Sequence, residues 1–562
     1  MSKRVLGSYI VWLMVVFAPA VTAAPKKVSF SQPPKIVEAY DFVEITANIE
    51  GPDASSPFTD ATLSGSFGNV GGTERTAVEG FCDSADGRVF RIRFMPSSPG
   101  DYTYSIIYRQ GSFETKGTGT FKASAGQRRG PIRVDPKYPW HFIWEGTGEH
   151  YFFNGTTTFW LLGWKEERII NYCIERLEKL KINRIRVLLA GASSTYWGEP
   201  VMTGDGFTYF LRPWIVEAPD RFDHPKIDFS RFDVAYWQKW ERMLRFARDH
   251  NMIVSVIQDI STHKAQPAAG SEDERRYLRY AAARLSAFSN INWDLGDDLD
   301  SFRDEKWAHE TGTLLEGWDP YKHLATSHPV HRANQDRASA WFGFTSIQNW
   351  SRRQHELMLE ERQIQMKTGR IIPQTNEEYG YEDHYPHWAP APPDGESAES
   401  LRRVAWDIAM AGAYGTAGES CRRGTNVWPD TGGGWINGRG DDTMTMLKGY
   451  EHIVDFFTSF EWWKTEPHDE LVSKGAYCLA KPGEIYAVYL PVRPMCGNSE
   501  AFEHQQVCGE VNLKLEPGTY EARWFNAYTG ETIPLPAVTG PAWTLPKTPG
   551  WLDWALLLQK KR

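Results

Sequence analysis

The chain has 562 residues, a formal net charge of −9 at pH 7, and 14% aromatic residues. This length accommodates three or four domains. Nucleic-acid binding needs a basic surface, so the acidic balance argues against a nucleic-acid partner. The six cysteines are too few for a disulfide scaffold and show no CxxC metal spacing. Cys496 and Cys508 flank a polar loop and are candidates for a disulfide bond in an oxidising compartment.

Residues 1–24 have the pattern of a signal peptide. A basic head at residues 1–4 precedes an apolar run at 11–17 and small residues at 21–24. The apolar run is too short to span a bilayer, and no later segment is long and apolar enough to do so. We therefore expect a protein exported to the periplasm or the extracellular space, cleaved near Ala23 or Ala24, with no membrane span.

The next segment, residues 25–125, is predicted to form an N-terminal β-sandwich. Apolar and polar residues alternate in the runs 42–49, 89–95 and 102–108, and a Pro/Gly turn separates the last two. Short alternating strands with such turns are typical of sandwiches. Short strands return in residues 466–562, where we predict a second, C-terminal β-sandwich.

Between them, residues 126–465 alternate strand and helix patterns. Helical spacing of apolar residues in segments such as 169–180, 237–247 and 277–285 precedes short apolar runs at 184–189, 252–257 and 291–295. Eight such alternations predict an α/β fold, a (β/α)8 TIM barrel with long loops on its catalytic face. A doubly wound sheet is the alternative, although the GxGxxG phosphate loop that usually accompanies it is absent.

Two predicted barrel strands end in clusters of acids. The first cluster holds Asp294, Asp297, Asp298 and Asp300, and the second holds Glu377, Glu378 and Glu382. Active sites of barrels lie at the carboxyl ends of their strands, and glycosidic hydrolysis needs two carboxylates. Crowding raises a carboxyl pKa, which suits a general acid in the first cluster. An isolated carboxylate in the second, close to Tyr379 and Tyr381, would stay ionised and could serve as a nucleophile.

Other polar residues end or follow the predicted strands and are candidates for binding substrate. Together with residues of the acidic clusters, this set comprises Asp259, His263, Asp297, His328, Gln348, Tyr379 and Glu382. Arg184 and Arg186 cannot be buried unpaired, so one of them either holds a catalytic carboxylate or forms a structural salt bridge. HExxH and EF-hand patterns are absent, and we expect no metal and no cofactor.

The barrel region resembles the apiosidase-like glycoside hydrolases, a bacterial family with a (β/α)8 catalytic domain. The segments that carry the resemblance are Asn-Ile-Asn-Trp-Asp-Leu-Gly-Asp-Asp at 290–298 and Glu-Tyr-Gly-Tyr-Glu at 378–382. Family members have Leu-Gly-Gly-Asp and Glu-Pro-x-Tyr-Glu there, which implies Asp298 as acid/base and Glu378 as nucleophile. Asp297 replaces the second Gly and Tyr379 the Pro, so the family's sugar is not carried over.

The flanking segments strengthen this resemblance. Ser-Pro-Phe-Thr-Asp at 56–60 and Gly-Phe-Cys-Asp at 80–83 resemble the small β-sandwich that often precedes such barrels. Ala-Arg-Trp-Phe at 522–525 and Asp-Trp-Ala at 553–555 resemble the C-terminal domain that is named for collagen binding. That name implies no function for this chain.

We therefore interpret the chain as an exported glycoside hydrolase acting on a poly- or oligosaccharide. We expect retention of the anomeric configuration, which requires the two carboxyl groups to lie about 5–5.5 Å apart, whereas about 6.5–9.5 Å would indicate inversion. A polysaccharide lyase and a non-catalytic glycan-binding protein are the alternatives. The sequence leaves open the sugar, the linkage, exo or endo action, and the oligomeric state.

Overall fold

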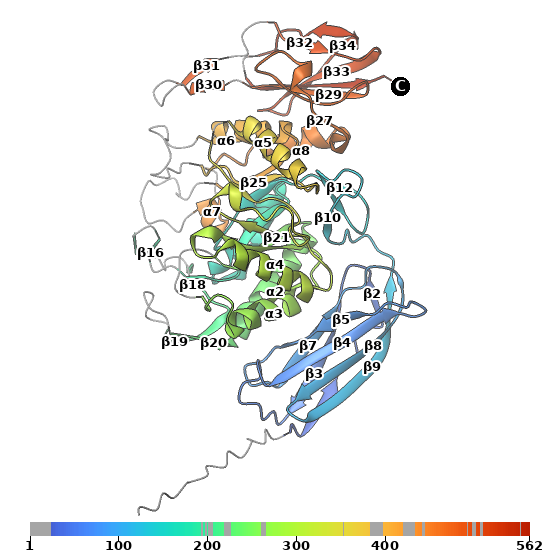
Figure 1. The fold of residues 1–562 in the computed structure, drawn as a ribbon, viewed down its shortest axis with the longest axis vertical. Coiled ribbons are helices and arrows are strands. Elements are labelled where there is room, and N and C mark those ends of the chain that lie inside the picture. The colour runs from blue at the N-terminus through green and yellow to red at the C-terminus, as the bar shows by residue number, and fades with distance from the viewer. Residues whose placement is uncertain are drawn as a thin grey trace, which may run out of the picture.

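Three regions of regular structure follow one another along the long axis of the molecule (Figure 1). The structure is a computed structural model. It describes residues 24–561 except 193–194, 197–198, 201–205, 209, 219–225, 260–265, 352, 383–396, 420–432, 441–443, 492, 497–501, 506–509 and 551. The predicted signal peptide and Cys508 lie outside the described residues, and so does His263.

The N-terminal region is a sandwich of two sheets. One sheet has the order β1 (Lys27–Phe30), β3 (Val43–Glu50), β7 (Val89–Phe94), β6 (Phe81–Cys82). The other has the order β2 (Ile36–Glu38), β9 (Phe113–Ser124), β8 (Gly100–Gln110), β4 (Ala61–Asn69), β5 (Thr76–Glu79). Alternate residues of β3, such as Val43, Ile45 and Ala47, are buried in the core between the sheets, as the period of two predicts.

The central region is a nearly closed barrel of eight parallel strands. In chain order these are β13 (Gly155–Thr157), β14 (Arg184–Leu188), β21 (Ile253–Ile257), β22 (Ile291–Asp297), β23 (Ala325–His328), β24 (Ile347–Gln348), β25 (Thr375–Glu378) and β26 (Tyr414–Ala417). The first strand pairs with the second and the last. Ala325 forms a parallel bridge with Phe342 across the remaining gap. The predicted barrel is confirmed, and the doubly wound alternative is wrong.

Helices pack around the barrel strands. They are α1 (Glu167–Lys179), α2 (Val234–Asp249), α3 (Glu272–Leu285), α4 (Glu305–Trp318), α5 (Gln354–Lys367), α6 (Ala398–Met410), α7 (Gly433–Asn437) and α8 (Tyr450–Thr458). Side chains of Asp233, Ser271, Asp304 and Ser397 cap α2, α3, α4 and α6, accepting the free backbone N–H groups of the first turn. None of the described helices is long and apolar enough to cross a membrane.

A long excursion follows the second barrel strand. It contains β15 (Gly191–Ala192), β16 (Thr195–Tyr196), β17 (Glu199–Pro200), β18 (Phe210–Leu211), β19 (Trp214–Ala218) and β20 (Lys226–Phe232). β15 pairs with β18 and β19 pairs with β20, so short hairpin-like ladders extend from the carboxyl end of β14.

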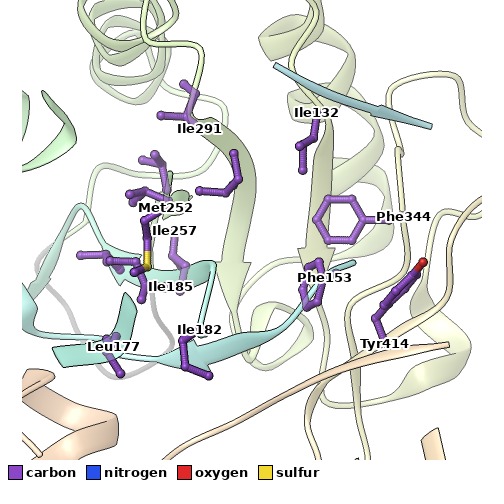
Figure 2. Close-up of a cluster of buried hydrophobic side chains, with 14 of the residues drawn as sticks. Ile132, Phe153, Leu177, Ile182, Ile185, Met252, Ile257, Ile291, Phe344 and Tyr414 are labelled. Atoms are coloured by element: carbon purple, nitrogen blue, oxygen red, sulfur yellow. The ribbon is translucent and has the colours of Figure 1, made fainter. Parts of the chain in front are cut away.

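A small antiparallel sheet and an aromatic cluster lie at the amino end of the barrel. The sheet consists of β10 (Ile132–Val134), β11 (Phe142–Trp144) and β12 (His150–Tyr151). Phe142 stacks on Phe153 at 5.9 Å and meets Phe344 edge-on at the same centroid distance. Figure 2 shows Phe153 and Phe344 within this buried cluster, beside Tyr414 and Ile132. These rings fill the amino end of the barrel.

The C-terminal region is a β-sandwich whose larger sheet has the order β27 (Glu466–Pro467), β28 (Tyr477–Lys481), β29 (Ile485–Leu490), β36 (Trp554–Lys560), β33 (Thr519–Asn526), β34 (Thr532–Thr539). Its other strands are β32 (Asn512–Lys514) with β35 (Ala542–Thr544), and β30 (Arg493–Cys496) with β31 (Phe502–Gln505). Tyr477 and Leu479 belong to the core of the barrel, whereas Cys478 and Ala480 pack into the sandwich. Strand alternation therefore gives this sheet two buried faces.

A buried ion network joins the N-terminal sandwich to the barrel. Both terminal nitrogens of Arg93 on β7 lie 2.8 Å from the carboxylate of Glu241 on α2. Arg284 on α3 donates to Glu241 at 2.7 Å and to Asp83 at 2.8 Å. Burial raises the pKa of Glu241, but Arg93 and Arg284 outweigh it and lower the pKa to about 2. The network is charged at neutral pH. Removal of any one member therefore leaves a buried charge without its partner.

We predict that Arg284→Met lowers the stability of the protein by about 3–5 kcal/mol, because two buried carboxylates lose a partner. Thermal unfolding monitored by circular dichroism measures the effect. Arg109→Met is the matched control, since the Arg109–Glu114 pair is 48% and 41% exposed and an exposed pair contributes about 0–1 kcal/mol. Equal melting temperatures for the two variants would contradict the role given to the network.

Candidate active site

Two arginines on β14 lie inside the barrel, and both side chains are fully buried. Because they are two residues apart on one strand, they point to the same side. Arg184 Nη1 lies 2.6 Å from Glu377 Oε2. Arg186 Nη2 lies 2.7 Å from Asp297 Oδ1 and 3.5 Å from Asp294 Oδ2. Of the two roles left open for these arginines, Arg184 forms an internal salt bridge, and Arg186 holds an acid of the first cluster.

Glu378 ends β25 and is buried, with four polar or aromatic neighbours. Gln348 Nε2 donates to Glu378 Oε1 at 2.9 Å, and His328 Nε2 lies 3.4 Å from Oε2. Burial raises the pKa of Glu378, while Arg186 and hydrogen bonds from Gln348, Tyr381 and Trp350 act in the opposite direction. Glu378 is therefore not isolated, as expected from the sequence, but held by several donors, and burial outweighs them so that its pKa is raised on balance.

His328 ends β23 and lies between the two acidic clusters. Its Nδ1 pairs with Ser346 Oγ at 2.8 Å, and its Nε2 is 3.7 Å from Asp297 Oδ1 in addition to its approach to Glu378. Burial, reinforced by Arg186, lowers the pKa of His328 to about 4. The imidazole is thus neutral at physiological pH, and it separates two carboxylates without adding charge.

Asp298 follows β22 directly and has a left-handed backbone, with φ of 52°. The register between β22 and β23 shifts between Asp294 and Asp297, so the end of the strand is irregular. The Asp298 side chain is partly exposed, and within the described part of the chain no hydrogen bond reaches its carboxylate. Burial, with the charges of Asp297 and Glu378, raises the pKa of Asp298 to about 8.

Carboxylates outnumber cations in this cluster. The carboxylates are Asp294, Asp297, Asp298, Glu377 and Glu378, and the facing cations are Arg184 and Arg186. Burial also raises the pKa of Asp294 to about 7, although Arg186 opposes the change. The excess of acid over base means that the cluster retains protons near neutral pH, as a general acid requires.

The remaining predicted residues have different positions. Asp259 follows β21 at the mouth, where its carbonyl accepts the N–H of Asp297 at 3.0 Å and its carboxylate pairs with Gln266. Asp297, His328 and Gln348 belong to the cluster as described above. His263 lies outside the described residues.

Two predicted substrate-binding residues have structural contacts instead. The hydroxyl of Tyr379 pairs with that of Tyr450 on α8, so this ring lies among the helices rather than at the mouth. Glu382 accepts the backbone N–H groups of Thr445 at 2.9 Å and Met446 at 3.3 Å. The Glu382 carboxylate thus holds the backbone at Thr445 and Met446.

Of the aromatic residues beside Glu378, Tyr381 was expected near the carboxylate, whereas Trp350 and Trp435 were not predicted. Tyr381 hydrogen-bonds Glu378, and its ring lies 5.2 Å from that of Trp350 and 4.4 Å from that of Trp435. These three residues come from separate segments, so no spacing in the sequence relates them. In the sequence, Tyr379 and Tyr381 stand on either side of Gly380, and no spacing distinguishes the one that reaches Glu378.

Asp297, His328 and Glu378 are the described residues whose arrangement could hold a metal ion. One ligand atom from each lies within 4.8 Å of the others. The positive charge of Arg186 is already paired with Asp297, and it raises the free-energy cost of placing a second cation there. The arrangement is better suited to holding protons than to holding a metal, and the expectation of a metal-free site stays a prediction.

The chain matches two family models. Residues 143–418 match the model "Apiosidase-like, catalytic domain", and residues 36–109 match a domain of unknown function, DUF5060. A search of curated protein sequences finds no match.

Solved structures share the fold at low sequence identity. A protein from Bacteroides vulgatus ATCC 8482 assigned as a glycoside hydrolase superposes with a TM-score of 0.72 at 18% identity, covering 94% of this chain and 100% of its own. A family 5 glycoside hydrolase from the same organism gives a TM-score of 0.56 at 15% identity, covering 77% of this chain and 94% of its own.

We predict opposite effects of pH on the stability of two neighbouring variants. The raised pKa of Asp298 stabilises the fold only while the group is protonated, and this contribution is lost between pH 4 and about 8. The melting temperature of Asp298→Asn should therefore exceed that of wild type by a margin that grows as pH rises through that window. Asp300 has a lowered pKa, held down against burial by hydrogen bonds from His331 and Val330.

Asp300→Asn is the matched control, because its carboxylate stabilises the fold above the unfolded pKa and loses this effect as pH falls. This variant should melt below wild type at pH 7, with the gap closing in acid. Melting curves from pH 4 to 9 test both signs. The same pH trend in both variants would contradict the proton assignment.

Proposed function

The barrel of this chain belongs to the apiosidase-like glycoside hydrolases, and from that premise we propose that Asp298 and Glu378 cleave the glycosidic bonds of a poly- or oligosaccharide. The observation that carries the assignment is the pairing of a proton-retaining carboxyl with a hydrogen-bonded, buried carboxylate. Asp298 follows β22 and Glu378 ends β25, on one end of the barrel. Their charges act on each other, as the raised pKa of Asp298 reflects.

Asp298 is the proposed general acid. Its carboxyl is partly exposed, has no hydrogen bond within the described residues, and keeps its proton up to a pKa of about 8. Asp297, by contrast, is held by Arg186 at 2.7 Å. A free, protonated carboxyl at the mouth can donate to the departing glycosidic oxygen, whereas one fixed to a guanidinium cannot reorient toward it.

Glu378 is the proposed nucleophile. Burial raises its pKa, and hydrogen bonds from Gln348, Tyr381 and Trp350 oppose that shift and favour the ionised form. Neutral His328 adds a polar contact 3.4 Å away without pairing a full positive charge with the carboxylate. In a retaining reaction Glu378 attacks the anomeric carbon as Asp298 protonates the leaving oxygen. Asp298 then takes a proton from the water that hydrolyses the glycosyl-enzyme.

We predict that Asp298→Asn lowers kcat/KM by about 10²–10⁴, the usual contribution of general acid–base catalysis, and that Glu378→Gln lowers it at least as much. Product release from a panel of plant and algal polysaccharides measures both effects. For wild type, kcat/KM should fall as pH rises past about 8, where Asp298 loses its proton. An early NMR spectrum that shows the substrate's own anomeric configuration in the product would support retention.

Asp297→Asn and Asp300→Asn are the comparison variants for this experiment. Asp297→Asn removes a charge that raises the pKa of Asp298, so its alkaline limb should move to lower pH. Asp300→Asn should keep wild-type kcat, because that carboxylate accepts hydrogen bonds from Val330 and His331 and not from the cluster. If Asp298→Asn and Glu378→Gln both retain wild-type rates, the assignment of these two acids is wrong.

We also propose that the protein is exported. The support is the pattern of residues 1–24, with a basic head, a short apolar run and small residues at its end. Expression of the full chain in a bacterium should yield a mature protein that begins near residue 24 or 25, measured by intact-protein mass spectrometry of the periplasmic and culture fractions. An uncleaved chain confined to the cytoplasm would refute export.

A further inference from the structure

A buried ion pair lies beside the site and is separate from the carboxylate cluster. Arg176 on α1 donates from Nη1 to Glu419 Oε2 at 2.7 Å and from Nη2 to Glu419 Oε1 at 2.6 Å, a bidentate arrangement. The two side chains are 14% and 2% exposed. Burial acts to lower the pKa of Arg176, but the hydrogen bonds and charge of Glu419 outweigh it and raise the pKa. Arg176 is therefore a cation at neutral pH.

The pair packs against the backbone of α7 (Figure 1). Glu419 stands two residues beyond β26, at the end of the barrel that carries the acids, and its carbonyl accepts the N–H of Trp435 at 3.3 Å. A Cβ on Gly434 would lie 2.2 Å from the Cβ of Glu419. A Cβ on Gly440 would lie 2.2 Å from Arg176 Nη1 and 2.3 Å from Glu419 Oε2. The ion pair thus meets this segment both within α7 and just beyond its end.

The segment that contains α7 depends on such anchors. The helix has five residues, and isolated helices shorter than about 12–15 residues are marginal in water. Glycine occupies four of the eight positions 433–440, and glycine loses more conformational freedom on folding than any other residue. The N–H groups of Phe159 and Trp160 donate to the carbonyls of Trp435 and Ile436 at 3.2 and 2.6 Å. These bonds tie α7 to the residues that follow β13, and the Arg176–Glu419 pair is a second anchor.

The same helix carries Trp435, whose ring supports that of Tyr381. The two ring centroids lie 4.4 Å apart, and each residue is 3% exposed. Gly418, which forms a parallel bridge with Tyr381, makes this contact possible, since a Cβ there would lie 2.3 Å from Trp435 Cβ and 2.4 Å from Tyr381 Cδ1. Tyr381 in turn hydrogen-bonds Glu378. A continuous series of contacts therefore leads from Arg176 on α1 to the proposed nucleophile.

We propose that Arg176 and Glu419 are positioning residues for the hydrolysis: their ion pair fixes Trp435 behind the Tyr381 ring and thereby keeps the Tyr381 hydroxyl on Glu378. Without Arg176, the buried carboxylate of Glu419 loses its counter-charge, so it turns toward water and the backbone of α7 moves with it. The inference rests on the proposed function, because it takes Glu378 as the nucleophile. It gives a role in the reaction to two residues that lie outside the cluster of acids.

Loss of the ion pair should move the acidic limb of the pH–rate profile. The hydrogen bond from Tyr381 favours the ionised form of Glu378, so weakening it raises the pKa of Glu378 further. In Glu419→Gln, the acidic limb of kcat/KM should therefore lie about one pH unit or more above that of wild type, the usual effect of a hydrogen bond to a charged group. The alkaline limb, set by Asp298, should stay in place, because Glu378 is ionised there in both proteins. Rates are measured on the plant or algal polysaccharide that wild type cleaves fastest.

Two comparisons separate positioning from stability. Asp553→Asn is the matched control, since Arg403 lies 2.8 Å from Asp553 in a pair whose side chains are 10% and 11% exposed and which joins α6 to the C-terminal sandwich. This variant should lose melting temperature as Glu419→Gln does but keep the acidic limb in place. Tyr381→Phe should move the limb by itself, and adding Glu419→Gln to it should move the limb no further, because the ion pair acts through the Tyr381 hydroxyl.

Arg176→Lys provides a milder change in case Glu419→Gln does not fold. Lysine keeps the positive charge but cannot form two parallel hydrogen bonds with a carboxylate. The acidic limb of this variant should move in the same direction as that of Glu419→Gln and by less. Circular dichroism and melting temperature establish which variants are folded before their rates are compared.

The protonation of Glu378 can also be followed without substrate. Because its pKa is raised, the protonated carboxyl stabilises the fold, and this contribution is lost as pH rises through the folded value. Glu378→Gln, which cannot ionise, should therefore be more stable than its parent at pH 8. This margin, as a ratio of unfolding equilibrium constants, should be about tenfold larger in the Glu419→Gln background. The other titratable groups that face Glu378 are the same in both backgrounds: Arg186, His328, Asp297, Asp298 and Tyr381.

The outcomes distinguish this inference from the catalytic assignment. An acidic limb that stays in place in Glu419→Gln and Arg176→Lys, or a shift that adds in full to that of Tyr381→Phe, would overturn the positioning role. An equal shift in Asp553→Asn would overturn it as well. With Glu378→Gln inactive, each of these results sinks this inference alone. Wild-type hydrolysis by Glu378→Gln would instead refute the catalytic assignment, and this inference with it.

Discussion

The arginine pair inside the barrel is the constraint on which the site depends. Arg184 and Arg186 are fully buried on β14, where an unpaired guanidinium would be prohibitively costly. Their partners are carboxylates delivered by β22 and β25, on opposite sides of β14 in the sheet order. The charges therefore tie together three strands of the barrel, and they place the acids where the strands end.

The same pairing accounts for the protonation of the site. Two cations face five carboxylates, and burial removes the water that would otherwise stabilise the excess negative charge. Asp297 takes the contact to Arg186 and Glu377 the contact to Arg184. Asp298, left without such a contact, is the group for which retaining a proton is easiest, with a pKa of about 8. The same set of charges thus affects both the stability of the barrel and the proposed catalysis.

The flanking sandwiches contact helices on the outside of the barrel. The N-terminal sandwich is joined through the Arg93–Glu241–Arg284 network on α2 and α3, on the outside of the barrel. The C-terminal sheet packs on the helices, where His355 of α5 stacks on Tyr477 at 3.6 Å and pairs with Asp469. Aromatic rings around Phe142 fill the amino end of the barrel.

The sequence by itself determined the class of fold and the location of the acids. Apolar runs of strand length, separated by helical periodicity, depend on local spacing, and the acids of 294–300 and 377–382 directly follow such runs. Tertiary structure decided which polar residues meet. Tyr379 and Glu382 are adjacent in sequence to Glu378 but turn to Tyr450 and to the backbone of Thr445. Ser346 and Trp350 carried no signal, because contacts between residues on different strands and loops depend on how the barrel closes, and no local pattern encodes that.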